Sequence, residues 1–350
     1  MMRAGDTLLL FTAAALVAAT PVFARQKGGA IRVQTNEVVT PVSVMDRNAD
    51  FVLDLAPADF RVFDDGVPQR IEHCELADAP LSIALVLETS ARVAPLGDAV
   101  HSAGAVFTQA IMARDGEAAL ITCGSAAQVR LPFTSDRDAV EKAISTAEFA
   151  GSGTTLYDGM AIAVRLLKTR PAERRRILLV IGESSDNGSE DNLRDVLREA
   201  ETENIAIYAA GLSSTGAALR SGSTPTMRLD KHLPPISAGA PSSNFAGHKV
   251  PALDWGSVAF LLLSQGRNAI SSNQLEIAAG ATGGIHYDAR GEKGLESALD
   301  QISSELYEQY VLTYKPKSAH APGFHRIRVT VSRPGLAVRF RSMYFLPAGS

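Results

Sequence analysis

A stretch in the first third of the chain, Leu81 to Arg92, joins an apolar run to chemically active side chains. The run is followed at once by a carboxylate and two hydroxyls, those of Glu88, Thr89 and Ser90. A continuous apolar run is typical of a strand covered on both faces in a parallel sheet. Because ligands of open α/β sheets bind at the carboxyl ends of such strands, these oxygen-bearing side chains predict a ligand-binding site.

The segments that must position this site alternate between apolar strands and amphipathic helices. We expect strands at residues 81–87, 118–123, 128–133, 177–181, 205–211 and 285–287, and helices at residues 99–111, 136–144, 156–167, 193–203, 275–281 and 294–310. Asp136 is a suitable N-cap, and the pair Gly283 and Gly284 is typical of a helix C-terminus. This βαβ order predicts an α/β fold with a doubly wound, mostly parallel, Rossmann-like sheet.

Three consecutive arginines, Arg174 to Arg176, precede the strand expected at residues 177–181. They admit two interpretations, a phosphate-binding patch or the solvated start of a strand. The second is favoured, because short charged runs most often face solvent.

Both ends of the chain have a β-strand pattern. Val38–Val44 is β-branched, and Pro41 within it favours an edge position or a bulge. Asp64-Asp65-Gly66 lies between two short alternating runs and predicts a hairpin, and Arg333-Pro334-Gly335-Leu336 predicts another. Neither β portion is large enough to be stable alone. We therefore expect one β-sandwich made of residues 25–79 and 310–350, with an α/β domain at residues 80–309 inserted between them.

An insert at residues 213–272 interrupts the α/β pattern. It is rich in Ser, Pro and Gly as far as residue 243 and then carries a short apolar run at residues 258–263. That run is too short to cross a membrane, which takes about 20 apolar residues. A helix packed on the domain, or a lid over it, is the expected structure.

The first 24 residues have the pattern of an export signal. Arg3 supplies a positive region, Leu8–Ala19 is apolar, and Val22-Phe23-Ala24 is a small-residue cleavage site. The alternative is an anchor that is retained. The signal predicts a mature protein that is exported to the periplasm, the cell surface or the medium, without a transmembrane span.

The net charge bears on which partners the chain can bind, and the cysteine content bears on whether it has a disulfide. The net charge is −4, with acidic and basic residues mixed and no basic stripe, so nucleic acid is not an expected partner. Export permits a disulfide between the only two cysteines, Cys74 and Cys123, although both are also interpretable as buried small side chains.

Motifs typical of enzymes are missing from the sequence. There is no G-x-S-x-G elbow, no H-E-x-x-H and no phosphate-binding glycine loop with its lysine. His232 and His248 lie in the insert near Asp230 and Asp254, where spacing gives no geometry. We therefore expect no catalytic residue; a hydrolase is the remaining enzymatic alternative.

Four sequence runs make the chain resemble the von Willebrand factor type A domain and, beyond it, the exported von Willebrand factor A-related proteins of Acidobacteria. The runs are DFRVFDDGVPQ at residues 59–69, GSGTTLYD at 151–158, ATGG at 281–284 and YVLTY at 310–314. The order β, α/β, β also resembles that of integrin β chains. The resemblance implies a protein-binding module rather than an enzyme.

The resemblance also implies a divalent metal, Mg²⁺, held by an Asp-x-Ser-x-Ser motif, a later Thr and an Asp after the fourth strand. Residue by residue, Glu88 stands for the first Asp, Ser90 and Thr154 match, and Glu183 stands for the last Asp. These four are the candidate metal ligands. The second Ser of the motif is Arg92 here.

Three of the five positions therefore differ from the metal-binding pattern. A Glu is one methylene longer than an Asp, and Mg²⁺ needs near-octahedral geometry at about 2.0–2.1 Å. Arg92 cannot coordinate a metal, but a guanidinium turned inward can pair with Glu88 or Glu183. The alternative is an Arg92 that points to solvent above carboxylates that keep the site soluble. The hypothesis is a degenerate metal site, with a weakly bound ion or none, on an adhesion-like module that binds a protein partner through Glu88, Ser90, Arg92, Thr154 and Glu183. A structural component of a cell-envelope assembly that binds through the sandwich edges is the second hypothesis.

Overall fold

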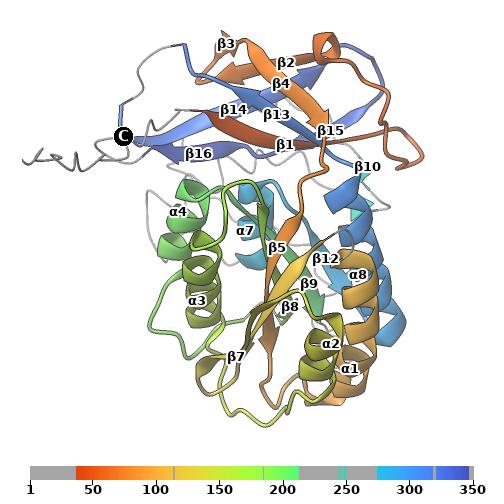
Figure 1. Cartoon of the computed structure of the whole chain (residues 1–350), viewed down its shortest axis with the longest axis vertical. Coiled ribbons are helices and arrows are strands. Elements are labelled where there is room, and N and C mark those ends of the chain that lie inside the picture. The colour runs from red at the N-terminus through yellow and green to blue at the C-terminus, as the bar shows by residue number, and fades with distance from the viewer. Residues whose placement is uncertain are drawn as a thin grey trace, which may run out of the picture. The chain divides into compact units, whose positions relative to one another are not determined.

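A six-stranded sheet forms the centre of the computed structural model, with the strand order β12-β9-β8-β5-β6-β7 (Figure 1). The structure describes residues 37–112, 115–183, 185–212, 244–245, 248–249, 274–317 and 321–346, all within one unit that spans residues 36–350. The strands are β5 (Leu81–Glu88), β6 (Glu117–Cys123), β7 (Ala127–Thr134), β8 (Arg175–Gly182), β9 (Ile205–Leu212) and β12 (His286–Ala289). Every pairing is parallel except that of β6 with β7. The predicted mixed α/β fold with a mostly parallel sheet is confirmed.

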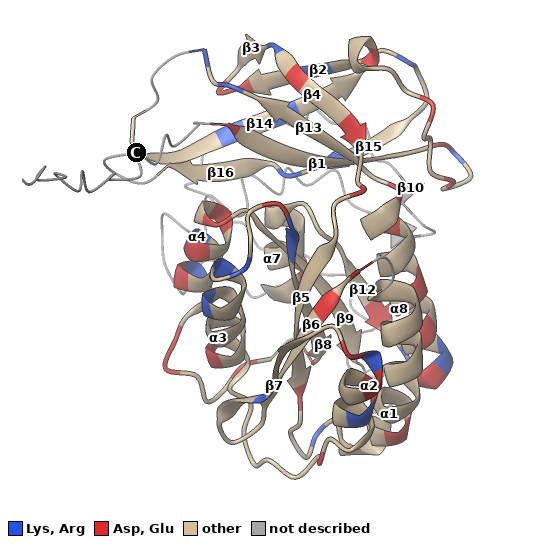
Figure 2. Ribbon diagram, viewed as in Figure 1, with Lys and Arg blue, Asp and Glu red and all other residues tan. Residues whose placement is uncertain are grey.

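Helices cover both faces of this sheet (Figure 1). One face packs in a common apolar cluster with α1 (Gly97–Val106), α2 (Arg137–Ser145) and α8 (Gly291–Tyr307). The other packs with α3 (Leu156–Lys168), α4 (Leu193–Thr202) and α7 (Gln274–Thr282). All eight residues of β5 are buried, as expected of a central strand with helices on both sides. Acidic and basic residues are interspersed along α3, α4 and α8 (Figure 2).

Strands from the two ends of the chain form two further sheets, each with four strands. One has the order β15-β1-β13-β4 and the other β16-β14-β2-β3. Their bounds are β1 (Val38–Met45), β2 (Phe60–Asp64), β3 (Val67–Gln69), β4 (Ile71–Leu76), β13 (Tyr310–Tyr314), β14 (Gly323–Val331), β15 (Ala337–Phe340) and β16 (Met343–Leu346). Side chains from both sheets, such as Val42, Val62, Leu312 and Val329, share one buried cluster. The two ends of the chain thus share one apolar core.

Local turn chemistry explains one predicted hairpin. Asp65 and Gly66 join β2 to β3 with φ of +48° and +83°, so two left-handed residues reverse the chain in a two-residue loop. The second predicted hairpin is wrong. The turn at Arg333–Leu336 leaves β14, which pairs with β2 and β16, and leads into β15, which pairs with β1 in the other sheet.

Two further expectations are corrected by the structure. The last helix begins at Gly291 and ends at Tyr307, so it lies about three residues before the expected range of 294–310. Arg174, Arg175 and Arg176 do not form a solvated start to β8, because all three are only partly exposed.

Arg175 and Arg176 instead donate to carbonyls where helices end. Arg175 Nη1 donates to Leu306 O near the C-terminus of α8 at 2.5 Å. Arg176 donates to Arg170 O beyond α3 at 2.8 Å and to Glu203 O beyond α4 at 3.2 Å. Helix C-termini carry unpaired carbonyls and partial negative charge, so they stabilise cations placed there.

Arg339 and Arg341, from the end of β15 and the turn after it, make the same kind of contact. Arg339 donates to Gly283 O after α7 and pairs with the buried Glu305 of α8. Arg341 donates to Glu201 O near the end of α4 at 2.5 Å, and its Nη2 lies 2.6 Å from Glu201 Oε2. The C-terminal strands are therefore joined to the α/β part by two buried ion pairs.

The predicted N-cap of α2 is Asp136, whose carboxylate accepts from Ala139 N at 3.1 Å. Replacing Asp136 with alanine is expected to lower the free energy of unfolding by about 1 kcal/mol, since one backbone N–H loses its partner. Urea unfolding measures this. Asp138→Ala, in the first turn but without the capping bond, is the control and should cost no more than about 0.5 kcal/mol. Equal losses in the two variants would contradict the cap.

Several expectations lie outside the described residues. These are the export signal at residues 1–24 and nearly all of the insert at 213–272, including the apolar run at 258–263. Two short strands of the insert are described, β10 (Asn244–Phe245) and β11 (His248–Lys249), which pair antiparallel. Both cysteines are free thiols, Cys123 buried and Cys74 half-buried. Among the helices described, none is long and apolar enough to cross a membrane.

Candidate functional site

The carboxyl end of β5 lies where the sheet changes its direction of growth. From β5 the chain continues to β6 and β7 on one side, whereas β8, β9 and β12 extend the sheet on the other. The crevice between β5 and β8 is therefore the topological switch point, the position at which open α/β sheets bind ligands. Glu88 is the last residue of β5, and Gly182 is the last residue of the neighbouring β8.

Glu88 is fully buried and its carboxylate is surrounded by donors. Its Oε1 accepts from Ser90 Oγ at 2.6 Å and from Thr154 Oγ1 at 3.2 Å. Its Oε2 accepts from the backbone N–H of Glu183 at 2.6 Å. Burial raises the pKa of Glu88, and the hydrogen bonds from Ser90 and Glu183 N oppose that rise. The carboxylate thus has protein partners on both oxygens.

Arg92 turns inward over this carboxylate, although its side chain is 42% exposed. Its Nη2 donates to Thr154 Oγ1 at 2.9 Å and to Ser185 O at 3.2 Å, and lies 3.7 Å from Glu88 Oε1. Its Nε lies 3.7 Å from Glu183 Oε2. All five residues predicted from the sequence are therefore brought together. Their role in binding remains a prediction.

Comparison with known proteins identifies this part of the chain. Residues 83–185 match the family model of the von Willebrand factor type A domain. The chain contains a von Willebrand factor type A domain. The match runs from β5 to just beyond β8, so it includes all five residues of the site. No curated protein is a significant match to the sequence.

Solved structures similar to the chain include one described as von Willebrand factor type A from Catenulispora acidiphila, with a TM-score of 0.44 and 8% identity over 91% of this chain and 76% of that one. Another is the conserved hypothetical protein BatB from Bacteroides thetaiotaomicron, with a TM-score of 0.41 and 15% identity over 65% of this chain and 98% of that one. A third is an aerotolerance-related membrane protein from Bacteroides fragilis NCTC 9343, with a TM-score of 0.40 and 13% identity over 64% and 99%.

The loop after β8 holds Thr154 and the start of α3, a role that the sequence did not indicate. Asn187 Oδ1 accepts from Thr154 N at 2.9 Å. Asp186 Oδ1 accepts from Leu156 N at 2.8 Å and from Ser189 Oγ at 2.6 Å. Asp186 therefore caps α3 from a distant segment. Sequence patterns identify caps that directly precede a helix, whereas Asp186 lies 30 residues after Leu156, the first residue of this helix.

The donor set of the A-type domain does not fit a divalent metal ion. The hydroxyls of Ser90 and Thr154 both donate to Glu88, and Thr154 Oγ1 also accepts from Arg92. The guanidinium lies 3.7 Å from an oxygen of each carboxylate. Mg²⁺ requires oxygen ligands in near-octahedral geometry, and here Arg92 donates to Thr154 Oγ1 and places a positive charge beside both carboxylates.

A second group of metal-ligating residue types lies in the outer sheets, formed by Asp64, Asp65 and His325. Asp64 Oδ2 already accepts from the hydroxyls of Tyr314 at 3.1 Å and Tyr344 at 2.9 Å. His325 Nδ1 faces Asp65 Oδ2 and its Nε2 faces Ala321 O, both at 2.8 Å. Both ring nitrogens of His325 therefore already have protein oxygen partners.

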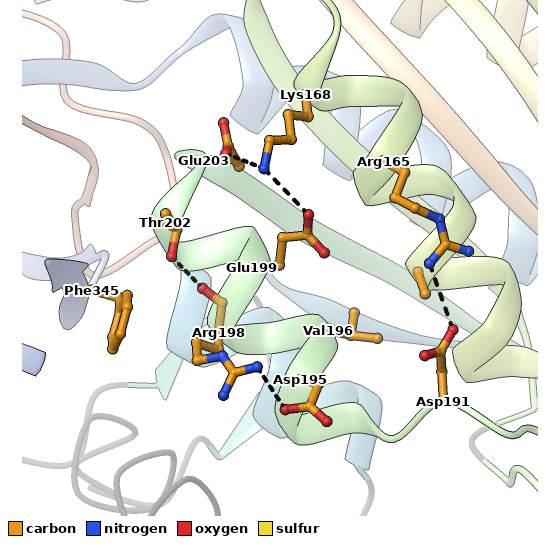
Figure 3. A pocket seen from close by; sticks show the side chains of 11 residues that line it. Arg165, Lys168, Asp191, Asp195, Val196, Arg198, Glu199, Thr202, Glu203 and Phe345 are labelled. Atoms are coloured by element: carbon orange, nitrogen blue, oxygen red, sulfur yellow. Dashed lines mark hydrogen bonds and ion pairs between the residues drawn. The ribbon is translucent and has the colours of Figure 1, made fainter. Parts of the chain in front are cut away.

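A surface hollow of about 230 Å³ lies between α3 and α4, with Phe345 of β16 at one side (Figure 3). Its charged side chains pair with one another, as Lys168 does with Glu203 at 3.0 Å and Arg198 with Asp195 at 3.0 Å (Figure 3). Exposed pairs of this kind contribute little stability. With its charges matched internally, the hollow offers no converging set of groups for a ligand.

Proposed function

We propose that the chain is an exported, non-enzymatic, adhesion-like module that binds a protein partner through the end of its A-type domain around Glu88 and Arg92. The single observation that supports this most is the meeting of Glu88, Ser90, Arg92, Thr154 and Glu183 at the sheet's switch point. Arg92 is half-exposed there while its guanidinium is fixed by several contacts. A fixed, accessible cation is a common anchor at protein interfaces.

The proposal also includes export to the periplasm, the cell surface or the medium, supported by the signal-like residues 1–24. The metal site is proposed to be degenerate, with little or no affinity for divalent ions. We further infer that the outer sheets form a β-sandwich into which the A-type domain is inserted, supported by their shared buried cluster.

A second candidate function is a structural role in a cell-envelope assembly through the edges of the outer sheets. It is favoured by the exposed apolar side chains of Val67 on β3 and Leu76 on β4, which are 43% and 41% exposed on edge strands. An unpaired edge with apolar side chains is a template for adding a strand from another chain. A hydrolase is the least favoured candidate, since no catalytic constellation was found among the described residues.

Capture of partners from an envelope extract, with purified chain as bait, distinguishes the first two candidates. Arg92→Gln removes the accessible cation and is expected to weaken capture of a specific protein about tenfold or more, the scale of an interface anchor. Leu76→Lys on the β4 edge is the matched comparison and should leave that capture unchanged. The reverse pattern, with Leu76→Lys abolishing capture and Arg92→Gln harmless, would assign binding to the edges.

A further inference from the structure

We infer that the guanidinium of Arg92 is the permanent cation of this site, so that the site is assembled without a metal ion and excludes one. The inference concerns the site of the proposed function, but only its consequence for partner binding rests on that function.

The buried carboxylate of Glu88 is stabilised by hydrogen-bond donors and by a neighbouring cation. In a buried site a carboxylate must find donors or a cation, because an unpaired charge in low dielectric is unstable. Here Ser90 Oγ, Thr154 Oγ1 and Glu183 N supply three hydrogen bonds at 2.6, 3.2 and 2.6 Å. Arg92 adds a positive charge 3.7 Å from Oε1. Oε1 therefore accepts two hydrogen bonds and has the guanidinium beside it, while Oε2 accepts one.

Arg92 lies between the two acidic side chains, Glu88 and Glu183. Its Nη2 and Nε each lie 3.7 Å from a carboxylate oxygen, one of Glu88 and one of Glu183. Ser185 O at 3.2 Å and Thr154 Oγ1 at 2.9 Å hold the guanidinium from the loop side. Because the guanidinium is covalently part of the chain, a chelator cannot remove this cation. A divalent ion would have to displace it or lie against it.

The length of the Glu88 side chain allows its carboxylate to reach the neighbouring strand β8. Its side chain reaches back over β8, where Gly182 has no side chain, and a Cβ there would lie 2.8 Å from Glu88 Oε2. The longer carboxylate thus fills space beside β8 and meets the N–H of Glu183. A shorter aspartate would leave that space and withdraw the carboxylate toward β5. Glu88 and Arg92 therefore act together, one filling the space and the other supplying the charge.

The test is calorimetric titration of the full chain with Mg²⁺ and with Mn²⁺. Wild type is expected to show no binding in the sub-millimolar range. The double variant Glu88→Asp, Arg92→Ser removes the cation, shortens the carboxylate and adds a hydroxyl. It is expected to bind Mn²⁺ at least about tenfold more tightly than wild type, the scale on which changes around a metal site alter affinity.

Controls separate the cation's removal from a general loss of charge. Arg198→Ser removes an exposed arginine that pairs with Asp195. This variant, like wild type, should show no binding of Mg²⁺ or Mn²⁺ in the sub-millimolar range. Arg92→Ser alone is expected to remain folded, because this side chain is half-exposed, and to gain measurable Mn²⁺ affinity. This single variant keeps the test valid if the double variant does not fold.

Two outcomes of the titrations overturn the inference: sub-millimolar binding by wild type, or a folded Arg92→Ser variant that binds Mn²⁺ no better than wild type. Partner capture is a separate readout. We expect a chelator to leave wild-type capture unchanged, and a chelator-sensitive wild type would also overturn the inference. If no partner depends on Arg92 while the titrations behave as expected, the proposed function fails and the built-in cation stands.

Discussion

Replacing Arg341 with methionine is expected to lower the free energy of unfolding by about 3–5 kcal/mol at pH 8, the cost of breaking a buried ion pair. Arg341 is 3% exposed and holds Glu201 through Nε at 2.8 Å and Nη2 at 2.6 Å. It also donates at 2.8 Å to the carbonyl of Met343, the first residue of β16. The substitution leaves a buried carboxylate without its cation, and it frees the C-terminal strands from the end of α4.

The loss should depend on pH. Burial raises the pKa of Glu201 to about 7, from 4.5 in an unfolded chain, against the lowering effect of Arg341. A carboxyl whose folded pKa exceeds its unfolded pKa loses stabilisation as the pH rises from about 4.5 to the folded value. Without Arg341 the folded pKa rises further, so the gap between wild type and variant should widen between pH 5.5 and pH 8.

Urea unfolding at the two pH values measures both effects. Arg198→Met is the matched control, because its pair with Asp195 is exposed and contributes at most about 1 kcal/mol. The double variant Glu201→Met, Arg341→Met removes both charges and should recover much of the stability lost in the single variant. A single variant that costs no more than Arg198→Met would show that the pair is not what joins the C-terminal strands to α4.

The parts of the fold that sequence predicts are those determined by local pattern. The uninterrupted apolar run of β5 is compatible only with a central position, where both faces are covered. Asp136 precedes its own helix, and Asp65-Gly66 tolerates the left-handed backbone that a two-residue hairpin needs. In each case the residues that specify the structure are adjacent in sequence.

The features that the sequence did not predict correctly depend on contacts between distant segments of the chain. The turn at Arg333–Leu336 has the same chemistry whether the next strand pairs with the previous one or crosses to another sheet. From its neighbours in sequence, Arg175 is expected to be solvated, whereas in the structure it donates to the carbonyl of Leu306 in α8. Glu201 and Arg341 are 140 positions apart, and nothing near either residue marks it as paired.

Some residues of the site could be predicted from local sequence patterns, whereas others depend on contacts between distant segments. Glu88 and Ser90 were found from their place after an apolar strand, and Thr154 and Glu183 from the resemblance to the A-type domain. The inward turn of Arg92 was one of two alternatives, because its direction depends on Thr154 and Ser185, which lie 62 and 93 residues further along the chain. Asp186 was missed, since its role is to cap a helix that precedes it.

Gly182→Ala is expected to disorganise this site and to lower the free energy of unfolding by about 1–3 kcal/mol, the usual cost of overpacking. A Cβ at position 182 would lie 2.6 Å from Glu88 Cβ and 2.8 Å from Glu88 Oε2. The first contact cannot be relieved by rotating the end of a side chain, because Cβ is fixed to the backbone of β5. Either the strands separate at their carboxyl ends or Glu88 leaves its donors.

Gly188→Ala is the matched control, in the loop that follows β8. A Cβ there would meet Thr154 O and Thr155 Cγ2 at 3.4 Å, which is ordinary contact, so the variant should change stability by no more than about 0.5 kcal/mol. Urea unfolding and capture of the Arg92-dependent partner are measured for both variants. Gly182→Ala should lose stability and capture together, because the clash displaces the residue that Ser90, Thr154 and Arg92 surround. A Gly182→Ala variant as stable and as competent as Gly188→Ala would mean that the close packing of β8 against Glu88 does not hold the site.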